Sequence, residues 1–353
     1  MSRLEVHRKF KLNGQSFQKS DSLLEFVKER AIDGIEFLEV WFDQKDFIYA
    51  KTSGSTGVPK EIKIKKKHML QSASATGTYF NLEEGTTALL CMSSDYIAGK
   101  MMWVRALCLG WELDVIRVTS NPLESTKKKY DFSAMVPLQV SNSLAKINLI
   151  KTLIVGGGAV SKELQDRLQF LPTKVFATYG MTETVTHIAV KKLNQFDANE
   201  KAYYKVFPMV TISKDDRGCM VVEAPLVSEG KVVTNDLVAI QSEMSFDWLG
   251  RYDSVINSGG IKLIPEQIEG KLSAVLKNNF FITGHKDSLL GEKVVLLIEG
   301  EGKPVKKRSE VLAYLVGVNL ERYEYPKEIY FVKKFDWTET GKIKRNSTLE
   351  MMF

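Results

Sequence analysis

Short apolar runs alternate with helical patterns through the middle of the chain, over residues 88–186. Each run is bounded by polar or glycine-rich breaks, as is typical of a buried strand. The expected strands are Ala88–Met92, Leu113–Val118, Ala134–Pro137, Leu153–Val155 and Val175–Ala177. Between residues 158 and 173, Leu164, Leu168 and Leu171 recur at helical spacing. This alternation predicts an α/β fold, a mostly parallel sheet with helices on its faces.

A second, smaller unit is expected from about Gly250 onward. Pro265 followed by Glu266 predicts a helix start, because the fixed φ of proline and an early acid both suit the first helical turn. Further elements are expected as strands at Phe280–Thr283, Val294–Ile298 and Ile329–Val332 and as a helix near Ser309–Val318. The 353 residues therefore divide into a large domain, 1–250, and a small α+β domain, 251–353.

The composition is that of an ordinary globular protein, with 44% hydrophobic and 26% charged residues. No apolar stretch approaches the roughly 18–20 residues that cross a bilayer. The N-terminal residues lack the apolar core of a secretory signal. We therefore expect a cytoplasmic protein with no membrane insertion.

The cysteines and histidines are scattered, which argues against a zinc site. Cys91, Cys108 and Cys219 lie far apart within apolar runs and are expected to be buried thiols. The net charge of +6 fits anionic substrates. Lysines do cluster at residues 63–67 and 127–129, but no aromatic residues are interleaved with them. We therefore interpret these lysines as solvated surface, with no nucleic-acid partner.

The sharpest local motif is a loop of glycine and hydroxyl residues at Thr52–Lys60, with the sequence TSGSTGVPK. Glycines let the backbone approach a ligand closely, and successive N–H groups can surround a phosphate. The loop is not a Walker A motif, because Pro59 separates Gly57 from Lys60 and Glu61 follows the lysine. On this segment alone, an ordinary Gly/Ser turn remains an alternative to a phosphate loop.

Further segments that suit nucleotide chemistry follow along the chain. They are Gly156-Gly157-Gly158-Ala159, the TYGMTET run at 178–184, the VTND run at 233–236, the GRYD and NSGGIKLIPEQIE runs at 250–253 and 257–269, and the TETGKIKR run at 338–345. Alone, each has an ordinary explanation, such as a turn after a strand or a surface lysine near a chain end.

Taken in order, the loop and these segments resemble the motifs of the adenylate-forming superfamily, which includes acyl-CoA synthetases, luciferases and peptide-synthetase adenylation domains. The resemblance runs from about residue 51 to residue 345. It implies a large N-terminal domain, here shortened at its start, and a small mobile C-terminal domain. It also implies ATP, Mg²⁺ and coenzyme A as substrates or cofactors, together with a carboxylic acid. A second subunit, as in a homodimer, is one way to cover the flank left by the shortened start.

The resemblance also implies a role for each matching residue. The implied nucleotide- and phosphate-binding residues are Ser53, Gly54, Ser55, Thr56, Gly57, Lys60, Gly157, Gly158, Tyr179, Gly180, Asp236 and Arg251. The implied catalytic residues are Thr182, Glu183 and Lys342, with Glu183 also holding Mg²⁺, for which one carboxylate suffices beside the phosphates. Asp253 corresponds to the hinge, and Gly259 and Gly260 to the channel for the pantetheine arm of CoA.

The segment expected to form the acyl pocket is Ser94–Lys100, in which Tyr96 stands where the family commonly has histidine. This segment resembles that of the o-succinylbenzoate–CoA ligases of menaquinone biosynthesis, whose substrate is a dianion. The candidate acid-binding residues are Tyr96, Gly99, Lys100, Arg105 and His187. The second carboxylate needs a cation or several hydrogen-bond donors in the pocket, which Lys100 and Arg105 could supply. The alternative for both residues is a solvated helix face.

The reaction expected from this resemblance is adenylation of the acid, with release of pyrophosphate, followed by transfer of the acyl group to CoA with release of AMP. Other functions stay open at this point. They are another aryl- or acyl-CoA ligase, an acyl-AMP ligase that loads a carrier protein, and a non-catalytic nucleotide-binding relative.

Overall fold

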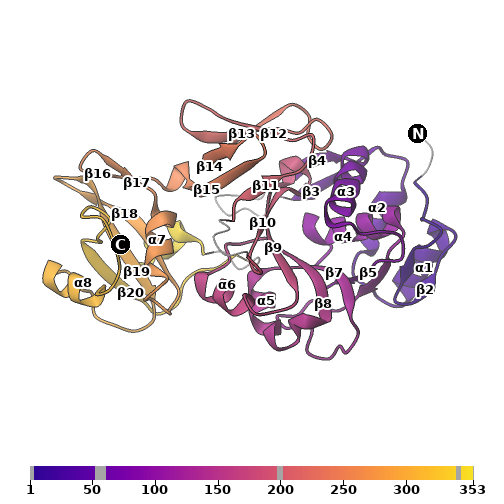
Figure 1. The fold of residues 1–353 in the computed structure, drawn as a ribbon, viewed down its shortest axis with the longest axis horizontal. Coiled ribbons are helices and arrows are strands. Elements are labelled where there is room, and N and C mark those ends of the chain that lie inside the picture. Colours follow the sequence, from indigo (N-terminus) through magenta and orange to yellow (C-terminus); the bar gives the residue numbers. More distant parts are fainter. Residues whose placement is uncertain (1–3, 52–60, 197–201, 339–342, 353) are drawn as a thin grey trace.

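The structure is a computed structural model that describes residues 4–51, 61–196, 202–338 and 343–352. A 13-stranded sheet and a 5-stranded sheet organise this part of the chain, with a separate hairpin of β3 (Phe47–Lys51) and β4 (Glu61–Lys65). The order in the large sheet is β12-β13-β14-β15-β11-β10-β9-β8-β7-β5-β6-β1-β2. Figure 1 shows the two sheets with the helices packed against them.

The middle of the large sheet is parallel, as the strand–helix alternation predicts. Its strands are β5 (Thr87–Leu90), β6 (Glu112–Val115), β7 (Tyr130–Met135), β8 (Ile150–Val155) and β9 (Lys174–Gly180). They pair in parallel in the order β6-β5-β7-β8-β9. Three of the predicted strands end too late. β5 ends at Leu90 rather than Met92, β6 ends at Val115 rather than Val118, and Pro137 begins helix α5 rather than ending β7. Proline suits that place, since the first helical N–H has no intrahelical acceptor.

Beyond β9 the same sheet continues with antiparallel strands. They are β10 (His187–Lys192), β11 (Tyr204–Val206), β12 (Thr211–Lys214), β13 (Cys219–Glu223), β14 (Lys231–Ser242) and β15 (Ser245–Arg251). At the other end, β1 (Lys11–Leu12) pairs in parallel with β6 and antiparallel with β2 (Gln15–Ser16). The fold is therefore α/β with a mixed sheet whose parallel centre is the predicted part.

Helices cover both faces of the parallel strands, because alternate side chains of each strand point to opposite faces. On one face Ala88 and Leu90 join a core with α1 (Ser20–Glu29), α2 (Ile35–Phe42), α3 (Lys66–Phe80) and α4 (Ile97–Leu109). On the other face Leu89 joins a core with α5 (Pro137–Ser143), the 3-10 turn η1 (Leu144–Leu149) and α6 (Lys162–Leu168). In Figure 1, α3 and α4 lie above β5 and β7, whereas α5 and α6 lie in the lower part of the picture beside β8.

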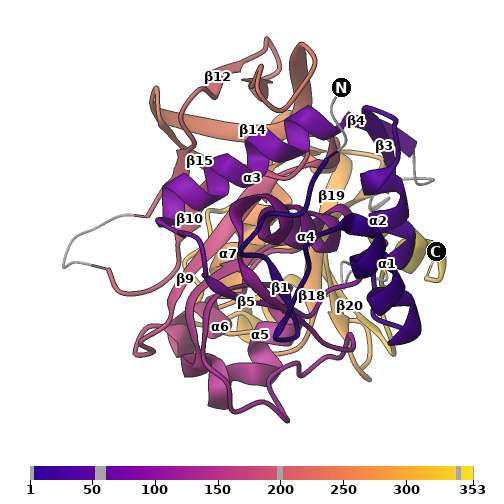
Figure 2. The ribbon, with the colours of Figure 1, turned by 90° about the vertical axis from the view of Figure 1, so that its right-hand side faces the viewer.

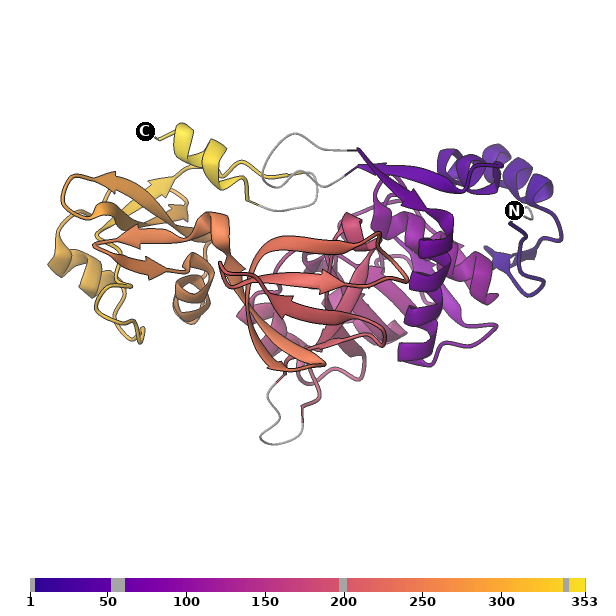
Figure 3. The same ribbon diagram turned by 90° about the horizontal axis from the view of Figure 1, so that it is seen from above.

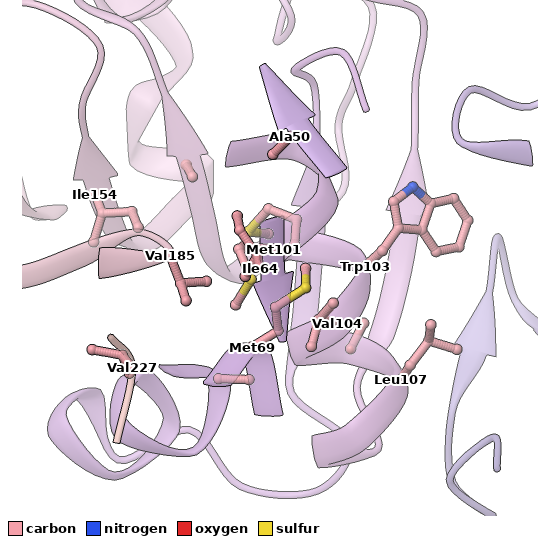
Figure 4. Close-up of a cluster of buried hydrophobic side chains, with 14 of the residues drawn as sticks. Ala50, Ile64, Met69, Met101, Trp103, Val104, Leu107, Ile154, Val185 and Val227 are labelled. Atoms are coloured by element: carbon pink, nitrogen blue, oxygen red, sulfur yellow. The ribbon is translucent and has the colours of Figure 1, made fainter. Parts of the chain in front are cut away.

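Helix α4 is enclosed on all sides, since every residue from Met101 to Leu107 is buried. A helix that is apolar all round belongs in the middle of a core. Figure 4 shows Met101 beside Ile64 and Met69, whereas Trp103 projects from the other side of the helix.

The second sheet contains β16 (Ile256–Ser258), β17 (Ile261–Leu263), β18 (Phe280–Asp287), β19 (Gly291–Glu299) and β20 (Glu328–Val332). Its helices are α7 (Pro265–Leu272), α8 (Arg308–Tyr314) and α9 (Arg345–Glu350). The expected helix start at Pro265 and the expected strands are thus present. Figure 3 shows this sheet at the opposite end of the molecule from α1 and α2.

Within the described residues, no helix combines the length and the apolar character needed to cross a bilayer.

Candidate functional site

Asp236 on β14 is the centre of a polar cluster formed by residues from distant segments. Its Oδ2 accepts a hydrogen bond from the Tyr179 hydroxyl at 2.6 Å, and its Oδ1 accepts one from the Trp248 Nε1–H at 3.1 Å. Arg251 Nη1 lies 3.7 Å from Oδ1 and also makes a paired contact with Asp253, at 3.0 and 2.8 Å. The structure therefore brings together Tyr179, Asp236, Arg251 and Asp253, all of which are predicted site residues.

Antiparallel pairing produces this cluster. β14 and β15 pair with Asp236 directly opposite Arg251, so the carboxylate and the guanidinium emerge at the same level of the sheet. Asp253 lies two residues later in the 3-10 turn η3 (Tyr252–Ser254). Its pKa is lowered although burial alone would raise it, because the Arg251 guanidinium stabilises the carboxylate.

Tyr179 is only 9% exposed, and its ring makes edge-to-face contacts with Tyr204 and Phe246. Burial, and after it the Asp236 carboxylate, raises the pKa of the Tyr179 hydroxyl. The hydroxyl therefore stays protonated and acts as a donor to Asp236. The role of this ring against adenine stays a prediction.

A tight turn follows Tyr179 and Gly180, the last two residues of β9. A Cβ on Gly180 would lie 2.2 Å from the carbonyl oxygen of Thr186, so only glycine fits there. Next, Val185 has φ 66° and ψ −60°, and the Thr186 N–H donates to the Thr184 carbonyl at 2.7 Å. This is a γ-turn of the rare strained kind, at a β-branched residue. The strain lies directly beside the predicted catalytic pair Thr182 and Glu183.

Thr182 and Glu183 lie in the 3-10 turn η2 (Thr182–Thr184), where Glu183 is exposed. No group of three or more His, Cys, Asp or Glu side chains could hold a metal in the part of the chain that the structure describes. One exposed carboxylate nevertheless fits the Mg²⁺ that accompanies a nucleotide, since phosphates and water supply its remaining ligands. Gly157, with φ 80°, and Gly158 follow β8, the strand beside β9.

A buried cation on α4 lies close to His187, the first residue of β10. Arg105 is 1% exposed, its Nε donates to the Thr76 hydroxyl at 3.3 Å, and its Nη2 has no hydrogen-bond partner. No carboxylate among the described residues forms an ion pair with it. The same Thr76 oxygen lies 3.4 Å from Nε2 of His187. Arg105 and His187, both predicted as acid-binding residues, thus lie close together, with the Thr76 hydroxyl between them.

The environment of this cluster determines the charge states. Burial lowers the pKa of Arg105 to about 10, so its guanidinium stays charged near neutral pH. Burial, and after it the Arg105 cation, holds the pKa of His187 well below its usual value. The cluster therefore presents one fixed positive charge beside a neutral imidazole.

The other predicted acid-binding residues lie at the start of α4. Tyr96 is the residue before the helix, and a Cβ on Gly99 would lie 2.2 Å from the Ser93 carbonyl oxygen. The Lys100 ammonium donates to the carbonyl oxygens of Ser94 and Asp95, at 2.7 and 2.6 Å. Of the two candidate cations on α4, Arg105 is therefore the one that stands beside His187.

Gly259 and Gly260 form the turn of the β16–β17 hairpin, with φ 58° and 83°. Two successive positive φ angles at a two-residue hairpin turn favour glycine. Nothing lies within 4 Å of the position that a Cβ on Gly260 would occupy, so the turn has an open side.

The remaining predicted residues, Ser53–Lys60 and Lys342, lie outside the described residues. Their flanks are described. Lys51 pairs with Glu61 across the β3–β4 hairpin, and Trp337 pairs with Ile343 in an antiparallel bridge. Thr76, Trp248 and Val185 were not found from the sequence. Nothing in their local patterns distinguishes them, since their importance comes from long-range contacts.

Comparison with known proteins identifies this arrangement. The family model described as "AMP-binding enzyme" matches residues 37–222, which include the parallel sheet, α4 and the Tyr179–Thr184 turn. The chain belongs to the AMP-binding enzyme family. Its fold is that of the adenylate-forming enzymes.

Several members of this family are similar over most of the chain. An acyl-CoA synthetase (AMP-forming)/AMP-acid ligase II-like protein from Dyadobacter fermentans is 37% identical, with 91% of this chain and 93% of that one covered and a TM-score of 0.58. The 2-succinylbenzoate–CoA ligase of Listeria monocytogenes is 25% identical over 347 residues, which cover 89% of this chain and 72% of the relative. The o-succinylbenzoate CoA synthetase of Bacillus subtilis was solved with the acyl-adenylate intermediate OSB-AMP. Its TM-score is 0.73 at 20% identity, with 84% of this chain and 68% of that one covered.

Proposed function

We propose that this AMP-binding enzyme is an AMP-forming acid–CoA ligase whose acid is o-succinylbenzoate, as in menaquinone biosynthesis. The observation that carries the choice of acid is Arg105, a buried guanidinium with a free Nη2 and no carboxylate of its own among the described residues. A buried cation without a partner is costly, and an anionic ligand removes that cost. The curated ligases among its relatives act on a dianion of this kind.

In the first half-reaction the succinyl carboxylate of the acid attacks the α-phosphorus of ATP and pyrophosphate leaves. Arg105 would hold the aromatic carboxylate, which stays unreacted, while Tyr96, Gly99 and His187 border the pocket. Thr182, the loop Ser53–Lys60 and Lys342 would stabilise the charge on the phosphates. Glu183 would hold Mg²⁺, which supplies further neutralisation of that charge.

The nucleotide would lie along Gly157, Gly158 and the end of β9, with the ribose near Asp236 and Arg251. Both oxygens of Asp236 already accept from Tyr179 and Trp248, which fixes the plane of the carboxylate. Each carboxylate oxygen can accept a further hydrogen bond, so ribose hydroxyls can still bind.

In the second half-reaction the small domain, residues 251–353, would rotate about Asp253. Lys342 would leave the site and the Gly259–Gly260 turn would take its place. The CoA thiol attacks the acyl carbonyl, the thiol proton is lost, and AMP leaves as the thioester forms. A hinge of this kind needs torsion changes at only a few residues. We also propose that the enzyme works in the cytoplasm, without nucleic acid, and that a homodimer is its assembly.

The test is thioester formation from MgATP, CoA and a panel of acids: o-succinylbenzoate, benzoate, acetate and a medium-chain fatty acid. Turnover restricted to o-succinylbenzoate is expected. Turnover of another acid would leave the ligase chemistry standing and remove the substrate assignment. Pyrophosphate release without thioester would instead indicate an acyl-AMP ligase that loads a carrier protein.

A further inference from the structure

Two of the residues that we assign to the acid, Gly99 and Arg105, lie on α4, and the chain before residue 35 forms hydrogen bonds at both ends of this helix. At the C-terminal end, the His7 N–H donates to the Leu107 carbonyl at 3.1 Å. The His7 ring also packs on Gly110. A Cβ on Gly110 would lie 2.3 Å from Nδ1 of His7. In Figure 2 this part of the chain runs across α4 before it reaches β1 and α1.

At the N-terminal end, Ser94 is the point of attachment. Its backbone N–H donates to Asp33 Oδ2 at 2.7 Å, from a residue 61 positions earlier. Its hydroxyl accepts from the Trp103 indole at 3.1 Å, and its carbonyl accepts from Lys100 at 2.7 Å. Ser94 is only 4% exposed, and all three of its polar groups are engaged.

Gly34, the residue after Asp33, allows the backbone to approach Trp103 closely. It has φ 113°, and a Cβ there would lie 2.5 Å from the Trp103 Nε1. The backbone next to Asp33 is thus in tight contact with the Trp103 indole, which donates to the Ser94 hydroxyl. Trp103 itself is completely buried on the side of α4 away from Met101 (Figure 4).

We propose that Asp33 is a positioning residue for the acid site. Its hydrogen bond to Ser94 fixes the segment Ser93–Tyr96 and thereby the position of α4. The inference rests on the proposed function, because it assumes that α4 carries the acid-binding groups. Asp33 does not touch the acid. It holds the start of α4 in the position on which the proposed contacts of Tyr96 and Arg105 with the acid depend.

The hydrogen bond to Ser94 allows a matched test. An asparagine at position 33 keeps an oxygen that can accept from the Ser94 N–H, whereas an alanine does not. Glu36, exposed in the first turn of α2, provides a control of equal charge three residues away. The variants are therefore Asp33→Ala, Asp33→Asn and Glu36→Gln.

Steady-state adenylation is measured by pyrophosphate release, with acid and ATP varied in turn. For Asp33→Ala we expect the KM for the acid to rise roughly five- to tenfold, which corresponds to the net contribution of one ordinary hydrogen bond. The KM for ATP and kcat stay near wild type, because the acid is bound less well in ground state and transition state alike. Asp33→Asn recovers most of the acid affinity, and Glu36→Gln matches wild type.

Thermal unfolding of each variant separates positioning from stability. A lower Tm for Asp33→Ala with an unchanged KM for the acid would overturn the inference, as would an equal rise in the KM for ATP. Equal defects in Asp33→Ala and Asp33→Asn would also overturn it. If the wild-type protein adenylates a different acid, that acid is used, so a wrong substrate assignment is distinguished from a wrong positioning residue. A wild-type protein that adenylates none of the acids removes the proposed function and this inference with it.

Discussion

At the scale of single residues, Arg105 is the most informative side chain in the molecule. Its position on an enclosed helix removes it from water, and its only described polar contacts are the Thr76 hydroxyl and the Met102 sulfur. A chain selected for stability alone would have an apolar residue there, since an unpaired buried charge opposes folding. We therefore interpret its retention as a requirement of substrate binding.

Replacing Arg105 by methionine should weaken the binding of a dianionic acid far more than that of a monoanionic one. We expect the KM for o-succinylbenzoate to rise by about 100-fold, in line with the loss of one partner of a buried charge pair. The analogue 3-benzoylpropionate lacks the aromatic carboxylate, so its KM should hardly differ between wild type and Arg105→Met. Equal rises for both acids, in initial-rate assays of pyrophosphate release, would show that Arg105 does not bind the second carboxylate.

His187 makes folding stability depend on pH. The fold keeps its imidazole neutral, whereas the unfolded chain takes up a proton below the usual pKa of 6.5. The unfolded state then binds more protons, so the free energy of unfolding falls as pH falls, by up to about 1.4 kcal/mol per pH unit from this residue. In urea titrations below pH 6.5, His187→Asn should therefore lose stability less steeply than wild type. Parallel curves for the two proteins would contradict this prediction.

At the scale of helices and strands, the elements that could be predicted are those marked by a pattern within their own residues. Each parallel strand contains or adjoins a short apolar run that is visible in the sequence, and Pro265 marks the start of α7. The antiparallel half was not predicted. β14 has a half-buried pattern, and β11 meets β15 through pairs such as Tyr204 with Phe246, which no local pattern encodes.

The candidate site was predictable to the same extent. The resemblance to the family's motifs assigned Tyr179, Asp236 and Arg251 to the nucleotide, and the structure brings these three side chains together. Spacing along α4 could not decide between Lys100 and Arg105, because that choice depends on the carbonyl groups of Ser94 and Asp95. The Asp33 contact joins segments 61 residues apart and leaves no local pattern.

At the scale of the whole molecule, the predicted catalytic residue Lys342 is expected on the proposed small domain, whereas Tyr179, Asp236 and Arg251 lie on strands of the large sheet. Arg345 anchors the chain three residues beyond Lys342. Its Nη2 lies 2.8 Å from Glu269 on α7, and its Nη1 donates to the Ile282 carbonyl at 3.2 Å. We therefore expect Arg345 to move together with α7 and β18 when the proposed small domain rotates.

The two half-reactions should respond differently to changes in this segment. Lys342→Ala should nearly abolish adenylation of the acid, and Arg345→Ala should slow it by about 10- to 100-fold, because the positioning of a catalytic group is lost. Both variants should still form thioester from pre-made acyl adenylate and CoA. Lys307→Ala, an exposed change in the same domain, is the control. Equal losses in both half-reactions would contradict a rotation that removes Lys342 before CoA enters.

The hydrogen bond from Trp248 to Asp236 places an indole at the proposed ribose site. Indole emission depends on the polarity and hydrogen bonding around the ring, so occupation of this carboxylate by a nucleotide should change the fluorescence of Trp248. The protein thus carries an intrinsic optical probe of nucleotide binding. A Trp248→Phe variant would identify its share of the signal, and stopped-flow fluorescence would give the order in which acid and nucleotide bind, without any label.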